Sequence, residues 1–373
     1  MNRNRPEFEV VIADIVGGQL GAAVSRIDWL RGALGFRNFS RVWLESPEIE
    51  GKSLPKTLIA RVDAAEGPDG RPADIPPEPP LEPIRALLES EGLPVPRRYA
   101  ADPARGVELL EDLGEVSLAD FARSASEPEL ESLYAEACEL PPRLQRIEPR
   151  DSVANFQRRL DAEHFRYKAE RFARWSLGGD RGASPAVAKV VRDAFERIGR
   201  LMVEAPQRLA HRDLQSANLH VVDPSMRGVD PSTNHADPSR KAAGGRAARL
   251  VMIDLQGAFM APPEYDLVCL LRDSYVKLDD AAVDAHLARA RTALPDPPDE
   301  ESFRLRFDLL TLTRKGKDHA LFRAVAAERG DDRYLQYLSA TRRYLRSASL
   351  RVASNLNGFS DLNDIIQAIP EHS

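Results

Sequence analysis

The chain has 373 residues, of which 43% are hydrophobic and 29% are charged, as is ordinary for a soluble globular protein. Its formal net charge of -6 excludes the strong overall positive field of a typical nucleic-acid-binding protein. No apolar stretch approaches the roughly 18 residues of a membrane span, and the apolar run at residues 10–16 is broken by Asp14, unlike a signal peptide. We therefore expect a cytoplasmic protein with no nucleic-acid or membrane partner.

The cysteines, Cys138 and Cys269, both lie in apolar, helix-like surroundings. They form no CxxC pattern, so neither a disulfide framework nor a zinc site is indicated. We expect two buried, reduced thiols.

The first third of the chain is patterned mainly as strands. Residues 36–44 and 58–62 mix β-branched and aromatic residues with polar ones, as strands do. Residues 67–80 are rich in Pro, Gly and Asp and predict a loop. Residues 81–90 carry apolar side chains at helical spacing, and residues 107–110 predict a further strand.

From Ser117 onward the pattern is mostly helical, with one interruption. The short apolar segments Leu219–Val222 and 250–253 bracket residues 223–249, which hold almost nothing to bury. This polar segment predicts a flexible insertion in a β-hairpin.

These patterns predict an α+β protein with the layout of a bilobal protein kinase. Residues 1–114 would form a small β-rich, nucleotide-binding lobe. Residues 115–373 would form a larger helical lobe for catalysis and acceptor binding, with the insertion at 223–249.

The strongest motif is the run His-Arg-Asp-Leu-Gln-Ser-Ala-Asn at residues 211–218, directly before a predicted strand. It fits H-x-D-x-x-x-x-N, the pattern of kinase catalytic loops. Asp213 would accept the proton of the attacking hydroxyl or orient that hydroxyl. Asn218 would return across the loop to a Mg²⁺ ion on the phosphates of ATP, and His211 would fix the loop conformation.

A second carboxylate, Asp254, directly follows the apolar strand expected at residues 250–253. Mg²⁺ prefers oxygen ligands and is commonly held by one or two carboxylates together with phosphates. Asp254 is therefore a second candidate Mg²⁺ ligand. The alternative is that Asp213 caps a helix and Asp254 is an unrelated residue at a strand end.

The sequence after Asp254 favours a small-molecule acceptor. Leu255 and Gln256 follow Asp254 where protein kinases have Phe-Gly. Ala-Pro-Pro-Glu at residues 261–264 arrives within about ten residues, which leaves no room for a peptide-docking loop.

With these motifs the chain resembles the aminoglycoside phosphotransferase/choline kinase superfamily. It is most similar to the bacterial anomeric kinases that phosphorylate N-acetylmuramate and N-acetylglucosamine in cell-wall recycling. The residues that carry the resemblance are 211–218, 253–256 and 263–275, with weaker matches at 92–96, 109–114, 170–175, 334–335 and 344–346.

The resemblance implies a bilobal fold with ATP in its cleft. It implies that Asp213 is the catalytic base, that Asn218 and Asp254 bind Mg²⁺, and that Asp266 braces the catalytic loop. It also implies an adenine-binding hinge formed by the backbone of Glu111, Asp112 and Leu113.

The nucleotide-binding part departs from the family pattern. It has no clear GxGxxG, and only Gly35 with Asn38 precedes the strand that ends at residue 44. The usual strand lysine is not evident. Arg61 lies on the right kind of strand and could replace it electrostatically, although a guanidinium is not equivalent to an ammonium. The alternative is a solvated strand charge.

Residues beside the motifs are candidates for acceptor binding. Gln215 and Gln256 could hydrogen-bond sugar hydroxyls or an acetamido group, or could merely brace their loops. Arg272 and Asp273 could bind the sugar, or could form a buried ion pair that holds the lobe together.

A basic run and an aromatic cluster lie nearer the C-terminus. Arg314, Lys315, Lys317 and His319 could face an acidic sugar, although such a run is more often a solvated helix face. Tyr334, Tyr337 and Tyr344 have helical spacing, which is more often packing.

The leading hypothesis is a kinase that uses ATP and Mg²⁺ to phosphorylate an N-acetylated amino sugar. One alternative keeps the phosphotransfer chemistry but uses an aminoglycoside, a choline-like amine or another metabolite as the acceptor. Residues 304–351 are rich in arginine, which argues mildly against a polycationic acceptor such as an aminoglycoside. The other alternative is a nucleotide-binding pseudokinase scaffold. The unclear glycine-rich loop favours it, whereas retention of Asp213, Asn218 and Asp254 opposes it.

Overall fold

The computed structural model describes residues 5–30, 38–45, 48–49, 52–62, 78–222 and 248–371. The chain divides into two compact units, the first formed by Met1–Glu78, Pro94–Ser124 and His220–Ile253, the second by Pro79–Leu93, Ala125–Leu219 and Asp254–Ser373. No helix in the described part of the chain is both long and apolar enough to cross a membrane.

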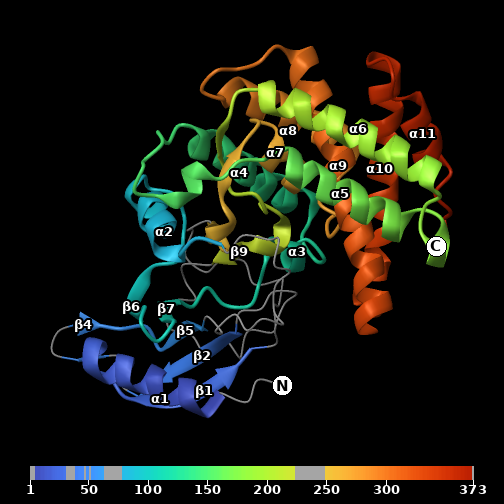
Figure 1. Ribbon diagram of the computed structural model, residues 1–373. Helices are drawn as coiled ribbons and strands as arrows, with labels where there is room; N and C mark the ends of the chain where they lie inside the picture. The colour runs from blue at the N-terminus through green and yellow to red at the C-terminus, as the bar shows by residue number, and fades with distance from the viewer. Residues whose placement is uncertain are drawn as a thin grey trace. The chain divides into compact units, whose positions relative to one another are not determined.

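The first unit contains most of the strands (Figure 1). Its elements are α1 (Arg5–Ile15), η1 (Val16–Leu20), β1 (Val24–Trp29), β2 (Asn38–Leu44), β3 (Glu48–Ile49), β4 (Lys52–Ser53), β5 (Thr57–Val62), β6 (Arg98–Asp102), β7 (Val107–Glu111), α3 (Leu118–Phe121), β9 (Leu219–Val222, whose first residue belongs to the second unit) and β10 (Arg249–Met252).

An antiparallel sheet in the order β1-β2-β5-β7-β6 forms the body of the first unit. Ile12 and Ile15 of α1 pack with inward-facing strand residues such as Val42, Leu58 and Leu109 in one hydrophobic core. This burial stabilises the sheet on one face, because apolar residues at alternate positions of neighbouring strands meet there.

The second unit is mainly helical. Its elements are α2 (Leu81–Ser90), α4 (Glu127–Gln145), η2 (Ala154–Gln157), α5 (Ala162–Ser176), η3 (Gly179–Arg181), α6 (Pro185–Glu204), β8 (Arg208–Ala210), η4 (Ser216–Asn218), η7 (Leu255–Gly257), β11 (Phe259–Ala261), α7 (Tyr265–Leu271), α8 (Asp280–Ala293), α9 (Glu300–Arg329), η8 (Asp332–Tyr337), α10 (Leu338–Asn355) and α11 (Ser360–Gln367).

The long helix α9 packs against α5, α6, α7 and α10 within this unit (Figure 1). Asp299 caps its N-terminus by accepting a hydrogen bond of 2.8 Å from the Ser302 amide, and Gly330 ends it with a φ of 63°. Gly316 lets the helices approach closely, because a Cβ there would lie 3.3 Å from the rings of Phe172 and Phe195.

The interpretation of the basic run on α9 as a solvated helix face is wrong. Arg314, Lys315 and His319 are all buried, and Lys317 is partly buried. Because α9 is covered by other helices on several sides, its charged side chains must find partners inside the unit.

The elements expected from the sequence are largely confirmed. The strand expected at 36–44 is β2 over its described residues, and those at 58–62 and 107–110 lie in β5 and β7; helix 81–90 is α2. Residues 63–77 and 223–247, together with Gly35, lie outside the described residues, and Arg249 already belongs to β10. The α+β class is confirmed, whereas the lobe boundary at residue 114 stays a prediction.

The expectation for the cysteines is also confirmed. Cys138 and Cys269 are unbridged and buried. Burial raises the pKa of each thiol to about 12, so both stay protonated near neutral pH.

Candidate active site

The catalytic-loop motif and the loop after Asp254 are brought together by a short strand pair in the second unit. β8 ends at Ala210 and β11 begins at Phe259, and these residues pair in an antiparallel ladder. The loop that leaves β8, residues 211–218, therefore starts at the same end of the ladder as residues 254–258, which enter β11.

The first turn of the catalytic loop is held by Asp266 of α7. Its carboxylate accepts hydrogen bonds from the backbone amides of His211 (2.7 Å) and Arg212 (3.0 Å). The bracing role expected for Asp266 is confirmed.

Arg212 adopts a left-handed backbone conformation with a φ of 81°, which is uncommon for a residue with a side chain. Its carbonyl oxygen accepts hydrogen bonds from Arg314 Nη1 at 3.2 Å and from Cys269 Sγ at 3.2 Å. Partners on both its amide and its carbonyl offset the cost of this conformation and fix the residue that precedes Asp213.

Asp213 forms an ion pair with Arg314 of α9. Arg314 Nη1 lies 2.7 Å from Asp213 Oδ1, and the two side chains are 5% and 26% exposed, respectively. Burial by itself would raise the pKa of Asp213, but the positive charges of Arg314, Lys317 and Arg212 lower that pKa well below its usual range. The carboxylate therefore stays ionised at any physiological pH.

Hydrogen bonds within the loop converge on the Asp213 carbonyl. It accepts from the Gln215 amide at 2.8 Å and from Asn218 Nδ2 at 2.9 Å, and the Asn218 amide donates to the Gln215 carbonyl at 2.8 Å. Because the amide nitrogen of the Asn218 side chain is used in this way, its orientation is set and its oxygen is directed away from Asp213.

The loop after β10 is fixed by two polar side chains. Asp254, which is exposed, has a φ of 63° and accepts a hydrogen bond from Gln256 Nε2. Asn155 is fully buried, and its Nδ2 donates to the carbonyls of Gln256 (3.1 Å) and Ala258 (3.0 Å). Asn155 was not predicted from the sequence, since a lone Asn lacks a motif.

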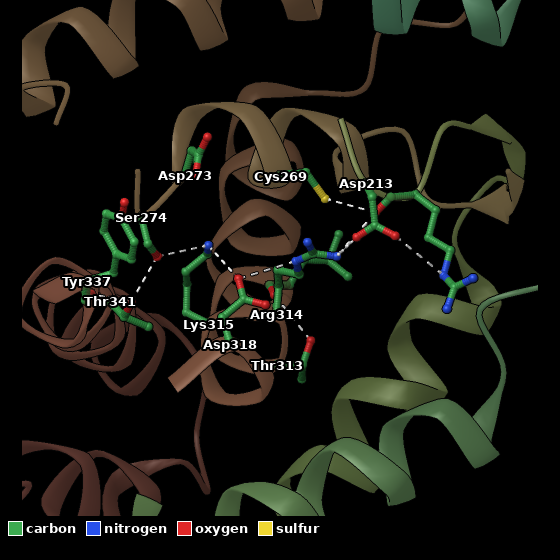
Figure 2. Close-up of polar contacts among 12 residues, drawn as sticks. Asp213, Cys269, Asp273, Ser274, Thr313, Arg314, Lys315, Asp318, Tyr337 and Thr341 are labelled. Atoms are coloured by element: carbon green, nitrogen blue, oxygen red, sulfur yellow. Dashed lines mark hydrogen bonds and ion pairs between the residues drawn. The ribbon is translucent and has the colours of Figure 1, made fainter. Parts of the chain in front are cut away.

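A chain of polar contacts leads from Asp213 through α9 within the helical unit (Figure 2). Arg314 Nε lies 3.5 Å from Asp318, whose carboxylate also accepts from Lys315 Nζ at 2.7 Å. Lys315 Nζ donates to Ser274 Oγ at 3.4 Å, and Ser274 Oγ lies 2.8 Å from Thr341 Oγ1. These side chains are buried, so the chain of contacts gives their polar groups partners away from water.

Arg272 and Asp273 are both buried and are engaged with different partners. Arg272 donates to Asp280 at 3.0 Å and lies over the rings of Phe307 and Tyr344. Asp273 accepts from the backbone amide of Ser216 in the catalytic loop at 2.8 Å, and from its hydroxyl. The acceptor-binding role predicted for both, like that predicted for Gln215 and Gln256, stays a prediction.

The candidate nucleotide-binding residues lie in the first unit. Arg61 is buried on β5 and pairs with Glu108 of β7 at 2.7 Å, so the interpretation as a solvated strand charge is wrong. Asp112 pairs with Arg41 at 2.7 Å, and the side chain of each is almost fully buried.

Asp112 directly follows β7. The residue is partly exposed, although its side chain is buried. Its exposed surface is therefore largely main chain. Glu111 pairs with Arg249 at 3.3 Å, and Leu113 is partly exposed. Main chain is therefore presented to solvent at Asp112, whereas the Glu111 amide already donates to the Arg97 carbonyl at 2.8 Å.

Lys168 of α5 is an unexpected buried cation in the second unit. It is 5% exposed, its Nζ has no hydrogen-bond partner among the described residues, and it lies over the rings of Phe165 (5.3 Å) and Tyr265 (5.4 Å). Burial, followed by repulsion from Arg314 and Lys317, lowers its pKa from 10.5 to about 7.

Replacing Lys168 with methionine is expected to stabilise the protein, most strongly at low pH. Between pH 7 and 10.5 the unfolded chain holds a proton that the folded protein has released, so the free energy of unfolding rises with pH in this window. Below pH 7 the buried charge costs its full penalty, and we expect Lys168→Met to gain about 2–4 kcal/mol there. Urea unfolding at pH 6 and pH 9 measures both values.

The gain in stability should shrink as the pH rises from 7 toward 10.5. The folded protein holds the Lys168 amine neutral in this range, and removing its proton on folding costs less free energy at higher pH. Lys189→Met, which alters an exposed lysine of α6, is the matched control and should change the stability little at either pH. A Lys168→Met variant that is less stable than wild type at pH 6 would contradict this account.

Comparisons with known proteins agree with the fold and the loop motif. Residues 68–229 match the model of the phosphotransferase enzyme family. The N-acetylmuramate/N-acetylglucosamine kinase of Pseudomonas aeruginosa is 26% identical over 306 residues, covering 78% of this chain and 78% of the relative.

Solved structures share the fold at low sequence identity. Choline kinase LicA from Streptococcus pneumoniae aligns with a TM-score of 0.55 and 14% identity over 93% of this chain and 99% of that one. The ADP-bound aminoglycoside phosphotransferase APH(2'')-Ib aligns with a TM-score of 0.50 and 13% identity, again over 93% and 99%. The chain is therefore a phosphotransferase with a kinase-like fold that resembles the aminoglycoside phosphotransferase/choline kinase superfamily.

Proposed function

We propose that this protein is an ATP-dependent kinase of an N-acetylated amino sugar such as N-acetylglucosamine or N-acetylmuramate. The observation that carries the proposal is the Asp213 carboxylate, ionised and held by Arg314 on a loop that Asp266 braces. The name of the Pseudomonas aeruginosa relative supports the choice of acceptor, and the ADP in the aligned phosphotransferase supports ATP as the donor.

In the proposed reaction Asp213 acts on the acceptor hydroxyl. Arg314 occupies Oδ1, so Oδ2 is the oxygen suited to accept the hydrogen bond of that hydroxyl and to align it with the γ-phosphate. Because the pKa of Asp213 is low, its main contribution is orientation and charge. As the new O–P bond forms, the bond between the γ-phosphate and ADP would break and the hydroxyl proton would pass to an oxygen of the transferred phosphoryl group. His211, held through its amide, keeps the loop in shape.

Asn218 and Asp254 are the proposed Mg²⁺ ligands. Their side chains supply an amide oxygen and an exposed carboxylate, hard oxygen donors that suit Mg²⁺. Asn218 directly precedes β9 and Asp254 closely follows β10, and these strands pair with one another. The bound ion would neutralise charge on the transferred phosphoryl group.

The first unit is proposed to bind the nucleotide. Arg61 would supply positive charge for the phosphates in place of the missing strand lysine, with Glu108 setting its position. The backbone of Glu111, Asp112 and Leu113 would pair with adenine, and the presented main chain of Asp112 supports this role.

On the acceptor side, Gln215 is partly exposed and is the strongest candidate among the predicted residues to hydrogen-bond the sugar. Gln256, Arg272 and Asp273 are buried and would act through the loops that they hold.

The test is ATP consumption with Mg²⁺ against N-acetylglucosamine, N-acetylmuramate, other hexoses, kanamycin-type aminoglycosides and choline. We expect turnover with the N-acetylated sugars. Turnover only with another acceptor would retain the phosphotransferase and overturn the sugar assignment. ATP–Mg²⁺ binding without turnover of any acceptor would favour the scaffold alternative. A sugar kinase of this kind would serve cell-wall recycling in the cytoplasm.

A further inference from the structure

Three tyrosines form an aromatic surface beside the polar chain that leads from Asp213. Tyr275 follows α7, and Tyr334 and Tyr337 lie on η8; we call these residues the tyrosine wall. The rings of Tyr275 and Tyr337 meet edge to face at 4.7 Å, and Tyr334 stacks on the buried Phe322 at 5.8 Å. All three tyrosines are partly exposed, so the wall has one packed side and one accessible side.

The tyrosine wall is anchored to the network that ends at Asp213. Tyr275 directly follows Ser274, which accepts a hydrogen bond from Lys315. Thr341, the partner of Ser274, donates to the Tyr337 carbonyl at 2.7 Å (Figure 2). The wall and the catalytic carboxylate are therefore held by one continuous set of contacts on α9 and α10, which fixes their mutual positions.

The phenol of Tyr275 lies close to the charged part of this network. Burial, and then the carboxylates of Asp318 and Asp273, raise the pKa of Tyr275 above its usual range, while Arg314 acts on it in the opposite sense. Arg314 Nη1 also donates to Asp213 Oδ1 at 2.7 Å, so one guanidinium acts on both side chains.

Aromatic rings alone suit either a sugar face or a quaternary amine, and the surrounding charge separates these ligands. The charges that lower the pKa of Asp213 come from Arg314, Lys317 and Arg212. Asp213 and Asp318 are already paired, with Arg314 and Lys315 respectively. A cationic acceptor at Asp213 would add positive charge beside Arg314 and Lys317, whereas a neutral or acidic pyranose would not.

We propose that the tyrosine wall is the acceptor subsite and that it takes the apolar face of an N-acetylated pyranose, whose reacting hydroxyl then reaches Asp213. This inference rests on the proposed sugar kinase function and assigns its acceptor specificity to Tyr275, Tyr334 and Tyr337. Concave sites that combine aromatic side chains with a few polar groups are the usual form of small-ligand sites, and the tyrosine hydroxyls add hydrogen-bonding capacity at the rim.

The experiment compares ring-removing and ring-preserving variants of the full-length protein. Tyr334→Ala and Tyr275→Leu are expected to raise KM for N-acetylglucosamine roughly tenfold or more, with KM for ATP changed less than about twofold. Tyr334→Phe and Tyr275→Phe keep the stacking surface and should stay within about threefold of wild type. Tyr167→Ala removes an exposed aromatic of α5 and should leave both KM values unchanged.

Thermal unfolding of each variant separates loss of the subsite from loss of the fold. Folded Tyr334→Ala and Tyr275→Leu variants with wild-type KM for the sugar would overturn the tyrosine wall and leave the proposed function intact. Wild-type protein that turns over no N-acetylated sugar would overturn the proposed function itself. Turnover of choline with a KM that rises in the same variants would overturn the charge argument, because the wall would then be a cation site.

Discussion

Replacing Asp213 with asparagine is expected to lower kcat about 10²–10⁴-fold, with little change in KM for ATP. Asparagine keeps the size of the side chain but removes the charge that Arg314 pairs and the acceptor capacity that the attacking hydroxyl needs. Its amide also presents a donor, which can turn the hydroxyl out of line. Steady-state kinetics with the acceptor found in the panel measures the effect.

The Asp213→Asn variant must still fold and bind ATP–Mg²⁺ for this result to have meaning, so both are measured alongside. Asp193→Asn changes an exposed carboxylate on α6 that pairs with Lys189, and it should retain wild-type kcat. An Asp213→Asn variant that keeps more than about a tenth of wild-type kcat would remove Asp213 from its proposed role.

Replacing Arg314 with methionine is expected to reduce both activity and stability. Removal of one partner from a buried ion pair costs about 3 kcal/mol, since Asp318 and Asp213 lose their shared cation. Misplacement of Asp213 by about 1 Å would lower kcat roughly 10²-fold. Urea unfolding and steady-state kinetics give the two values independently.

Arg314→Lys is the informative companion, because lysine keeps the charge but cannot reach Asp213 and the Arg212 carbonyl with a planar fork. We expect kcat for the lysine variant to lie between those of wild type and Arg314→Met. Arg166→Met, an exposed position on α5, controls for loss of an arginine as such. A folded Arg314→Met variant with wild-type kcat would show that the ion pair does not position Asp213.

The two predictions differ in what they test. Asp213 was identified from its place in a local motif, whereas the contact of Arg314 with Asp213 was found only in the fold. A large loss of kcat in both Asp213→Asn and Arg314→Met would mean that the helical unit contributes to catalysis beyond supplying the loop at residues 211–218.

Local patterns were sufficient wherever a function depends on residues close together in the sequence. The run at residues 211–218 identified the candidate catalytic loop, and the periodicity at 81–90 identified α2 to the residue. Asp266 was also anticipated, because it belongs to a motif that the resemblance carries. Such features are set by spacing and by side-chain chemistry within one element.

Burial of charged residues was the point at which sequence patterns failed. Arg314 and Lys315 look like a solvated run because charged helix faces usually are. Their burial depends on α5, α6 and α10 covering α9, which no local pattern records. From the sequence, Arg61 could likewise be either a phosphate ligand or a solvated charge. Its burial beside Glu108 of β7 excludes the solvated charge.

By itself, the sequence determined the α+β class, the phosphotransferase motif and the identity of the candidate catalytic and metal-binding residues, since these follow from periodicity and short-range spacing. Only the tertiary structure decided that Arg314 orients Asp213, that Asn155 fixes the loop after Asp254, and that three tyrosines gather beside them. Each of these contacts joins residues distant in the chain, and such pairings arise from helix packing and from the need of buried polar groups for partners.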